Sequence, residues 1–209
     1  MLGRSSRGDT VIELVLAFAI FSSAAVMTMT ILNQGVAIAG RSLEKSLVRQ
    51  QIDSQVEMLR YMKATNDILW KDVIASANLS NAPMALSPAT CPTVADLGNG
   101  INKNKSFFIT PSASASGSPS TSPSTSAFTM NTISTTSGKY ASPRTYARID
   151  YSPTNQTAYG MWVQVVRAEN KIKGTTGLDA YDFYIHACWD SIGSSQPSTV
   201  GTIVRLYEK

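Results

Sequence analysis

The residues of this 209-residue chain that could carry out chemistry are few. There are one histidine, His186, two cysteines, Cys91 and Cys188, and fourteen aspartates and glutamates. A single histidine leaves no choice of base, neither cysteine resembles an activated nucleophile, and no glycine-rich loop is present to hold a phosphate. Catalysis by carboxylates alone is the enzymatic class that remains open, and we expect the protein not to be an enzyme.

Carboxylates near the C-terminus are the nearest approach to a metal site. Asp179, Asp182 and Asp190 do not match a calcium loop, which needs closely spaced oxygen ligands. With one histidine and no CxxC motif there is no zinc constellation either. We therefore interpret His186 as a strand residue and expect neither a metal nor a cofactor.

One carboxylate stands apart from the others. Glu13 immediately precedes residues 14–40, which contain no Asp, Glu, Lys or Arg. The first part of this segment is mostly Leu, Val, Ala, Ile, Phe and Met. About 20 helical residues cross a hydrocarbon core of about 30 Å, so this segment can span a bilayer. No A-x-A-like cleavage site follows it, so we expect the apolar helix to stay on the mature chain.

The helical pattern continues beyond Arg41 in amphipathic form. Hydrophobic side chains recur at helical spacing at Leu43, Leu47, Val48, Ile52, Val56, Leu59 and Met62. The opposite face carries Arg41, Lys45, Arg49, Asp53 and Arg60. From Thr10 to about Lys63 this predicts one helix of about 80 Å at 1.5 Å per residue. Its second half should dock onto a folded domain.

The residues before the apolar segment place Glu13 in a known pattern. The stretch RSSRGDTVIE, residues 4–13, is a hydrophilic leader with two arginines and a glycine, Gly8, and Glu13 is the fifth residue after that glycine. It resembles the class III signal of type IV prepilins and the related pseudopilins. The resemblance implies that a membrane-embedded prepilin peptidase cuts after Gly8 and that the new N-terminal residue, Asp9, is N-methylated.

The same resemblance gives Glu13 a role in assembly. It implies that Glu13 pairs with the amino terminus of a neighbouring subunit, with other pilin subunits, the peptidase and the membrane assembly machinery as partners. A carboxylate on a membrane helix is disfavoured unless it finds such a partner. The alternative is that Glu13 lies at the membrane interface and favours the helix dipole. Asp9 departs from the family, which usually has Phe or another apolar residue there, and it would repel Glu13 four residues on.

The two cysteines indicate a compartment. A lone pair at long separation, in a domain attached to a membrane helix, suggests a disulfide formed outside the cytoplasm. Pilins and minor pilins often carry a disulfide near the C-terminus, and Cys188 resembles that position. Two unpaired buried thiols are the alternative.

The C-terminal part of the chain predicts a sheet. In YDFYIHACW, residues 181–189, alternate side chains are apolar, which is typical of a strand with one buried face. YARIDY, GMWVQVVRA and GTIVRLYE are further candidate strands. We expect these four to form an antiparallel meander covering the amphipathic helix, with Cys188 facing away from it, so that the segment around Cys91 lies over the outer face or edge. The fold class is α+β.

Between helix and sheet the chain changes character. A break at residues 65–67, capped by Asn66 or Asp67, should precede a second short helix, ILWKDVIASA, followed by turn-rich sequence. Residues 111–127 are all Ser, Thr, Pro, Ala or Gly and are typical of a flexible loop, either a plain spacer or an O-glycosylated surface. The expected parts are a leader (1–8), an apolar helix (9–40), its amphipathic continuation (41–64), a short helix with loops (65–110), the Ser/Thr/Pro-rich loop (111–127) and a sheet domain (128–209).

These patterns together favour a structural subunit of a type IV pilus-like filament, made in the cytoplasmic membrane and carried to the cell surface on assembly. The length of the middle region argues for a minor subunit. The alternatives are a membrane-anchored surface protein that binds sugar or a host surface without polymerising, and a pseudopilin of a secretion or DNA-uptake system. DNA capture would need a basic patch formed in three dimensions by Arg144, Arg148, Lys171 and Lys173.

Overall fold

The computed structural model divides the chain into two compact units. They are Met1–Leu43, the N-terminal unit, and Glu44–Lys209, the C-terminal unit. The described residues are 9–65, 68–76, 83, 89–99, 106–112, 127–168, 180–191 and 193–207. The expected cleavage site at Gly8, the cap positions Asn66 and Asp67, and most of the Ser/Thr/Pro-rich loop lie outside them.

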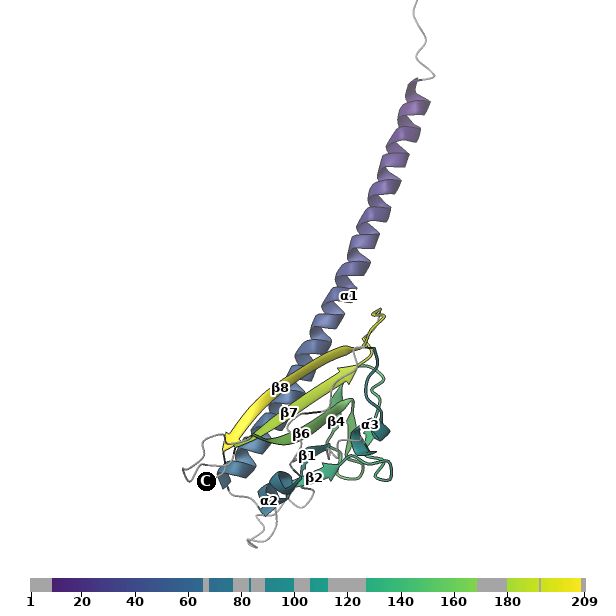
Figure 1. Cartoon of the computed structure of the whole chain (residues 1–209). Coiled ribbons are helices and arrows are strands. Elements are labelled where there is room, and N and C mark those ends of the chain that lie inside the picture. The colour runs from purple at the N-terminus through teal and green to yellow at the C-terminus, as the bar shows by residue number, and fades with distance from the viewer. Residues whose placement is uncertain are drawn as a thin grey trace, which may run out of the picture. The chain divides into compact units, whose positions relative to one another are not determined.

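The first described element is one long helix, α1, from Asp9 to Thr65 (Figure 1). No proline interrupts it, because the first proline of the chain is Pro83. It ends where the break was predicted, and the Thr65 hydroxyl donates a hydrogen bond of 2.8 Å to the carbonyl of Tyr61. The expected second helix, α2, follows at Ile68–Ala75. The long helix predicted from the sequence is therefore confirmed.

The amphipathic part of α1 belongs to the C-terminal unit and buries the predicted face. The buried hydrophobic side chains on it are Val48, Ile52, Val56, Leu59 and Met62. Leu43, predicted on the same face, is 61% exposed. It is the last residue of the N-terminal unit, and the helix buries its apolar face only from Val48 onward. The polar Gln55 is fully buried on this helix, which the sequence pattern did not indicate.

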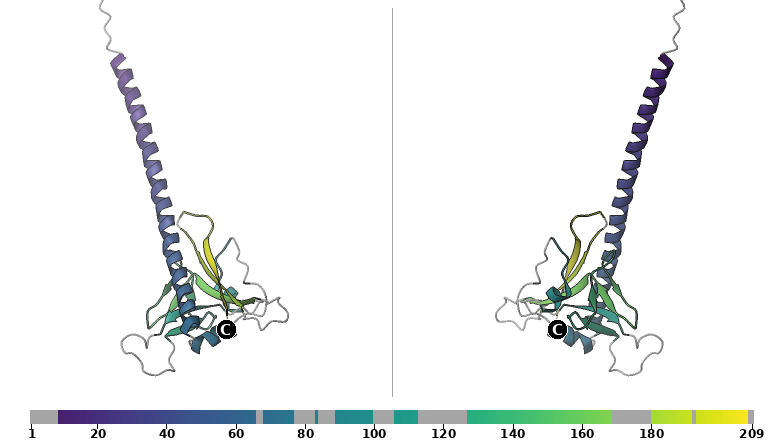
Figure 2. Two further views of the ribbon diagram at one scale, coloured as in Figure 1. Left: turned by 90° about the vertical axis from the view of Figure 1, so that its left-hand side faces the viewer. Right: turned by 90° about the vertical axis from the view of Figure 1, so that its right-hand side faces the viewer.

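A five-stranded antiparallel sheet packs on this helical face (Figures 1 and 2). Its strand order is β2-β1-β6-β7-β8. The strands are β1 (Phe107–Pro111), β2 (Phe128–Thr132), β6 (Met161–Ala168), β7 (Ala180–Trp189) and β8 (Ser198–Tyr207). The last three form an antiparallel meander, as expected. Strands β1 and β2 were not predicted, and β1 lies in sequence assigned to loops.

The fourth predicted strand does not belong to this sheet. YARIDY contains β4 (Arg148–Asp150), which pairs with β5 (Thr157–Tyr159) in a separate sheet of order β3-β5-β4. Its third strand, β3 (Tyr140–Ala141), runs parallel to β5. The predicted four-strand meander is therefore wrong at its first strand, because the short alternating run pairs with its own neighbour across the 151–156 loop.

A glycine carries the chain from the small sheet into the large one. Gly160 stands between β5 and β6 with a φ of +67°. A Cβ atom there would lie 2.2 Å from the carbonyl oxygen of Cys188. The Gly160 amide donates to the carbonyl of Ala141 in the small sheet, and its carbonyl accepts from the amide of Cys188 in the large one. Only glycine fits this crossing.

Strand β7 shows the predicted alternation. Tyr181, Phe183, Ile185, Ala187 and Trp189 are all buried in one hydrophobic cluster with the apolar face of α1. The neighbouring β6 is buried at six consecutive positions, 161–166, so it is covered on both faces. Trp70 of α2 extends the cluster, with its ring centroid 5.7 Å from that of Phe183.

The turn-rich sequence around residue 96 contains a short helix, α3 (Val94–Asn99), rather than turns alone. Thr93 and Asp96 cap its start reciprocally. The Thr93 amide donates to the Asp96 carboxylate at 2.8 Å, and the Asp96 amide donates to the Thr93 hydroxyl at 3.4 Å. These hydrogen bonds from Thr93 lower the pKa of Asp96.

Candidate functional site

The candidate site is the surface of α1 in the N-terminal unit. Every described side chain from Val11 to Gly40 is exposed. Of the large hydrophobic side chains that the structure describes as exposed, sixteen lie in this unit and four in the C-terminal unit. An 18-residue window of this helix has a mean hydropathy of 2.1 with no residue buried, so by length and composition α1 can cross a membrane. Soluble proteins seldom expose an apolar surface of this extent.

Three of the four hydroxyl groups described on this surface are satisfied inside the helix. Ser23 donates to the carbonyl of Ile20 at 2.8 Å, and Thr28 donates to that of Ala24 at 2.8 Å. Thr30 does the same to Val26 at 2.9 Å. The protons of these three hydroxyls are therefore already bonded, which removes much of the cost of placing them in an apolar environment.

A hollow lies near the start of the apolar surface. Leu14, Ala17, Phe18 and Phe21 line it, at the spacing i, i+3, i+4 and i+7. Such a set of four residues on one helix forms the hole that receives a side chain of a neighbouring helix. The small side chain of Ala17, among three large ones, makes room for it. The arrangement suits packing against a second helix.

Glu13 is the one carboxylate in the described part of this unit whose side chain the structure places. It is exposed, and no ion pair or hydrogen bond with another described residue engages it. Asp9 begins α1 one turn earlier, and Gly8 lies outside the described residues. The structure thus places Glu13 at the N-terminal end of a bare apolar helix, while cleavage after Gly8 and methylation of Asp9 stay predictions.

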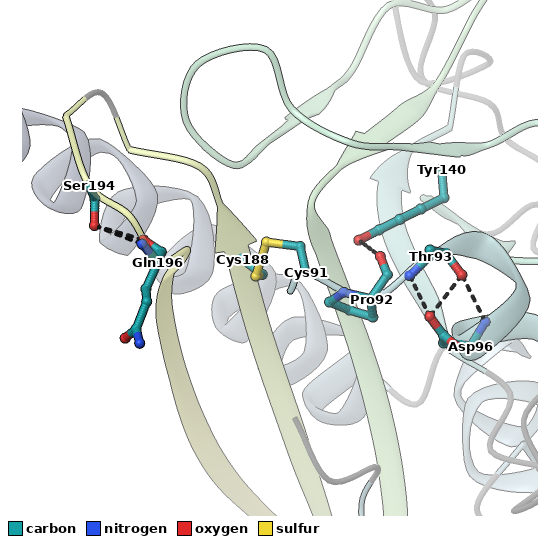
Figure 3. The surroundings of a disulfide bond; sticks show 8 residues. All are labelled: Cys91, Pro92, Thr93, Asp96, Tyr140, Cys188, Ser194 and Gln196. Atoms are coloured by element: carbon teal, nitrogen blue, oxygen red, sulfur yellow. Dashed lines mark hydrogen bonds between the residues drawn. A yellow bond between two sulfur atoms is a disulfide. The ribbon is translucent and has the colours of Figure 1, made fainter. Parts of the chain in front are cut away.

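The two cysteines form a disulfide in the C-terminal unit (Figure 3). Cys91 and Cys188 are joined with their Cα atoms 5.5 Å apart and 97 residues apart in sequence, so the alternative of two free thiols is wrong. By the two-residue alternation of β7, Cys188 falls on the face of the strand opposite Ala187 and Trp189. Close by, the Tyr140 hydroxyl donates to the carbonyl of Pro92, and burial raises the pKa of Tyr140.

A second carboxylate contributes in a way that sequence reasoning missed. Glu44, the first residue of the C-terminal unit, accepts hydrogen bonds from Nε1 of Trp189 at 3.1 Å and from the Ser191 hydroxyl at 2.7 Å. These bonds tie the helix to the end of β7, one residue beyond the disulfide. The available signal was its position four residues before Val48, on the buried face of the helix.

The other residues weighed for chemistry have structural surroundings. Asp182 forms a two-point pair with Arg205 across β7 and β8, at 2.6 and 2.7 Å, and Asp179 lies outside the described residues. No group of three or more His, Cys, Asp or Glu that could hold a metal occurs within the described ranges. His186 lies in β7, with ring centroids of Trp162 and Tyr184 at 5.5 and 6.2 Å, and burial lowers its pKa.

The basic residues considered for DNA capture are described only in part. Arg144 and Arg148 are exposed, and the Arg148 guanidinium lies 5.4 Å from the centre of the Tyr159 ring. Lys171 and Lys173 fall outside the described residues. The basic patch therefore stays a prediction.

Comparison with models of known protein families, with curated proteins and with solved structures finds no match to this chain.

Proposed function

We propose that this protein is a structural subunit of a type IV pilus-like filament, processed after Gly8 and assembled through α1. The N-terminal unit would pack among the same units of neighbouring subunits. The C-terminal unit would face outward. The middle region, which enlarges the C-terminal unit, favours a minor subunit over the main repeating one.

The observation that carries the proposal is the bare apolar surface of α1 from Val11 to Gly40, with Glu13 at its start. Apolar surface removed from water contributes about 25 cal/mol per Å², so an exposed helix of this kind is driven into lipid or against other helices. A filament core supplies the second environment and the cytoplasmic membrane the first. The subunit needs both, because it is held in the membrane before it is assembled.

Glu13 distinguishes a filament subunit from a simple membrane anchor. In a simple anchor a carboxylate at this place can favour the helix dipole at the interface, but in the hydrocarbon region the charge costs free energy. A filament supplies a partner, because cleavage creates a free α-amine on each subunit. Pairing the carboxylate with that amine would offset the cost and set the axial register between neighbours. It would also make assembly depend on processing, since the amine exists only after the leader is removed.

The surface beyond Glu13 supports helix packing over lipid contact alone. The hole formed by Leu14, Ala17, Phe18 and Phe21 has the geometry that accepts a side chain from a neighbouring helix. Lipid tails need no such hole. The disulfide in the C-terminal unit supports a location outside the cytoplasm after assembly, where such bonds persist.

The first experiment is the intact mass and N-terminal sequence of the protein recovered from the surface of cells that make it natively. We expect a chain that begins at Asp9, with or without one methyl group. A chain that still begins at Met1 would contradict the proposal and favour a membrane-anchored surface protein that does not polymerise.

The second experiment tests the role of Glu13 in assembly. Glu13→Gln keeps the shape of the side chain and removes the charge, so we expect normal cleavage but at least a tenfold loss of the subunit from sheared filaments. The matched control is Glu57→Gln, which removes an exposed carboxylate of the same helix that pairs with Arg60 at 2.7 Å. Equal incorporation of both variants would show that the pairing role is wrong. A requirement for Glu13 in secretion or DNA uptake, without extended fibres, would identify a pseudopilin.

A further inference from the structure

The C-terminal unit contains a polar hollow of about 330 Å³ where its two sheets meet. The lining comes from the ends of β1 and β2 and from the loops that precede β3 and β5. The lining residues are Ser112, Thr129, Ser137, Gly138, Lys139, Pro153, Thr154, Asn155 and Gln156. All nine are described, and neither the proposed filament role nor the disulfide uses them.

Buried hydrogen bonds fix one wall of the polar hollow. Thr110 and Asn131, both almost fully buried, meet the Gln156 side chain there. The Gln156 amide oxygen accepts from the Thr110 hydroxyl at 2.8 Å and from the Asn131 amide at 3.1 Å. Its nitrogen donates to the carbonyl of Pro111 at 3.3 Å. Both ends of the Gln156 amide are therefore held before any ligand arrives.

Lys139 is the only charged residue among the nine that line the polar hollow. Its ammonium donates to the side-chain oxygen of Asn131. An ammonium has three protons to donate, so this bond leaves two. The ion pairs recorded between described residues, Arg60 with Glu57 and Arg205 with Asp182, do not involve Lys139. The positive charge therefore has no carboxylate to balance it among the residues that form the hollow.

The remaining polar side chains of the lining are hydroxyls and amides, which can both donate and accept hydrogen bonds. The hydroxyls of Ser112 and Thr129 and the side-chain amide nitrogen of Asn155 have no hydrogen-bond acceptor recorded among the described residues. A lining with a cation, several free donors and no carboxylate complements a ligand that is rich in acceptors and carries negative charge. It is a poor site for a divalent cation, which needs oxygen anions. The lining also has no aromatic ring on which a nucleic-acid base could stack.

We propose that the polar hollow binds an acidic saccharide, with its carboxylate or sulfate on Lys139 and its hydroxyls on the surrounding hydroxyl and amide groups. The volume suits one sugar ring rather than a long chain. Both anion types present the same acceptor chemistry to an ammonium, and the choice between them is left to the experiment. The proposal is independent of filament assembly, because it uses only the C-terminal unit.

The test uses the full chain in detergent micelles and four water-soluble probes. They are glucuronate, N-acetylneuraminate, galactose 6-sulfate and neutral galactose, followed by saturation-transfer NMR, with empty micelles as the blank. We expect saturable binding of at least one acidic sugar. We also expect galactose to bind at least tenfold more weakly than the acidic sugar that binds best. The carboxylated and sulfated probes distinguish the two anion types.

Two variants locate the binding. Lys139→Met keeps the length of the side chain and removes the charge, so we expect at least a tenfold rise in Kd for the acidic sugar. Lys71→Met, which removes an exposed lysine of α2 that is not among the nine lining residues, is the matched control and should leave Kd unchanged. Thr154→Glu places a carboxylate at an exposed position on the rim of the polar hollow and should also raise Kd at least tenfold. This second variant keeps the proposal testable if Lys139→Met fails to fold.

Three results would overturn the proposal. One is that no acidic sugar binds saturably to the wild-type chain. Another is that galactose binds as tightly as the acidic sugars. The third is that Kd is the same in the wild type, in Thr154→Glu and in a folded Lys139→Met variant, which would place the binding elsewhere on the protein.

Discussion

Replacing Gln55 with leucine should destabilise the C-terminal unit strongly. An apolar side chain at a buried position would ordinarily favour folding, but here it removes hydrogen bonds that the backbone needs. Strand β1 is paired with β6 only at Phe107, opposite Val163. Two residues further along β1, at Ile109, the side chain of Gln55 forms the backbone hydrogen bonds that a neighbouring strand would otherwise form. Its oxygen accepts from the amide of Ile109 at 3.0 Å, and its nitrogen donates to the carbonyl of Ile109 at 2.8 Å.

The size of the effect follows from these two bonds. Gln55 and Ile109 are both fully buried, so water cannot replace a lost partner. A buried polar group left unsatisfied costs about 1 to 3 kcal/mol, which gives about 2 to 6 kcal/mol for the amide and the carbonyl together. Leucine has nearly the volume of glutamine, so a cavity adds little to this.

The assay is urea unfolding of the full chain in detergent micelles, followed by the fluorescence of the buried tryptophans Trp70, Trp162 and Trp189. The matched control is Gln51→Leu, one turn earlier on α1. The buried side-chain oxygen of Gln51 has no hydrogen-bond partner among the described residues, so its loss should be neutral or stabilising. If Gln55→Leu costs less than about 1 kcal/mol, or no more than Gln51→Leu, then the side chain does not complete the edge of β1 and our reasoning is wrong.

Three further predictions concern the C-terminal unit, each measured by the same unfolding assay. Reducing the bond between Cys91 and Cys188, 97 residues apart, should cost about 4 to 5 kcal/mol in the chain-entropy model, and an unchanged midpoint in reductant would contradict this. Gly160→Ala should destabilise far more than Gly138→Ala, because both have positive φ but only Gly160 has a carbonyl oxygen 2.2 Å from the added Cβ, and equal losses would refute it. Burial lowers the pKa of His186 below 6.5, so its contribution is complete above pH 6.5 and is lost as the pH falls through the folded pKa. His186→Asn should therefore lose less stability than the wild type between pH 7.5 and 5, and parallel curves would exclude this cause.

The elements that could be predicted are those with a long, regular pattern. Helical spacing from Val48 to Met62 and two-residue alternation in β7 each extend over several periods, and both are present in the structure. Short elements could not be predicted in the same way. Strand β4 has three residues, too few to show which sheet it joins. Strand β1 could not be recognised in this way because it begins with three consecutive apolar residues, FFI, and a search for alternating residues does not detect such a run.

The individual residues that matter can be separated in the same way, into those that a local sequence pattern reveals and those that it does not. Glu13 could be found from the sequence because a single charge is conspicuous beside 27 uncharged residues. Gln55, Glu44 and the polar hollow could not, because their partners are distant in sequence. Gln55 bonds to a residue 54 positions away, and Glu44 to one 145 positions away. Such pairings depend on where the tertiary fold brings the chain, and polar residues of this kind look ordinary in a local pattern.

The two units differ in whether they bury their own hydrophobic side chains. The C-terminal unit buries its large side chains around one cluster and satisfies its internal backbone groups through two sheets and Gln55. The N-terminal unit buries none of the side chains described from Val11 to Gly40, and a lone helix has no means of doing so. Its stability in the cell therefore has to come from outside the chain, from lipid or from other helices. A carboxylate at the start of that surface costs free energy in lipid and can find a partner among helices. The hole beside it can accept a side chain of a neighbouring helix, and the proposed function rests on both features.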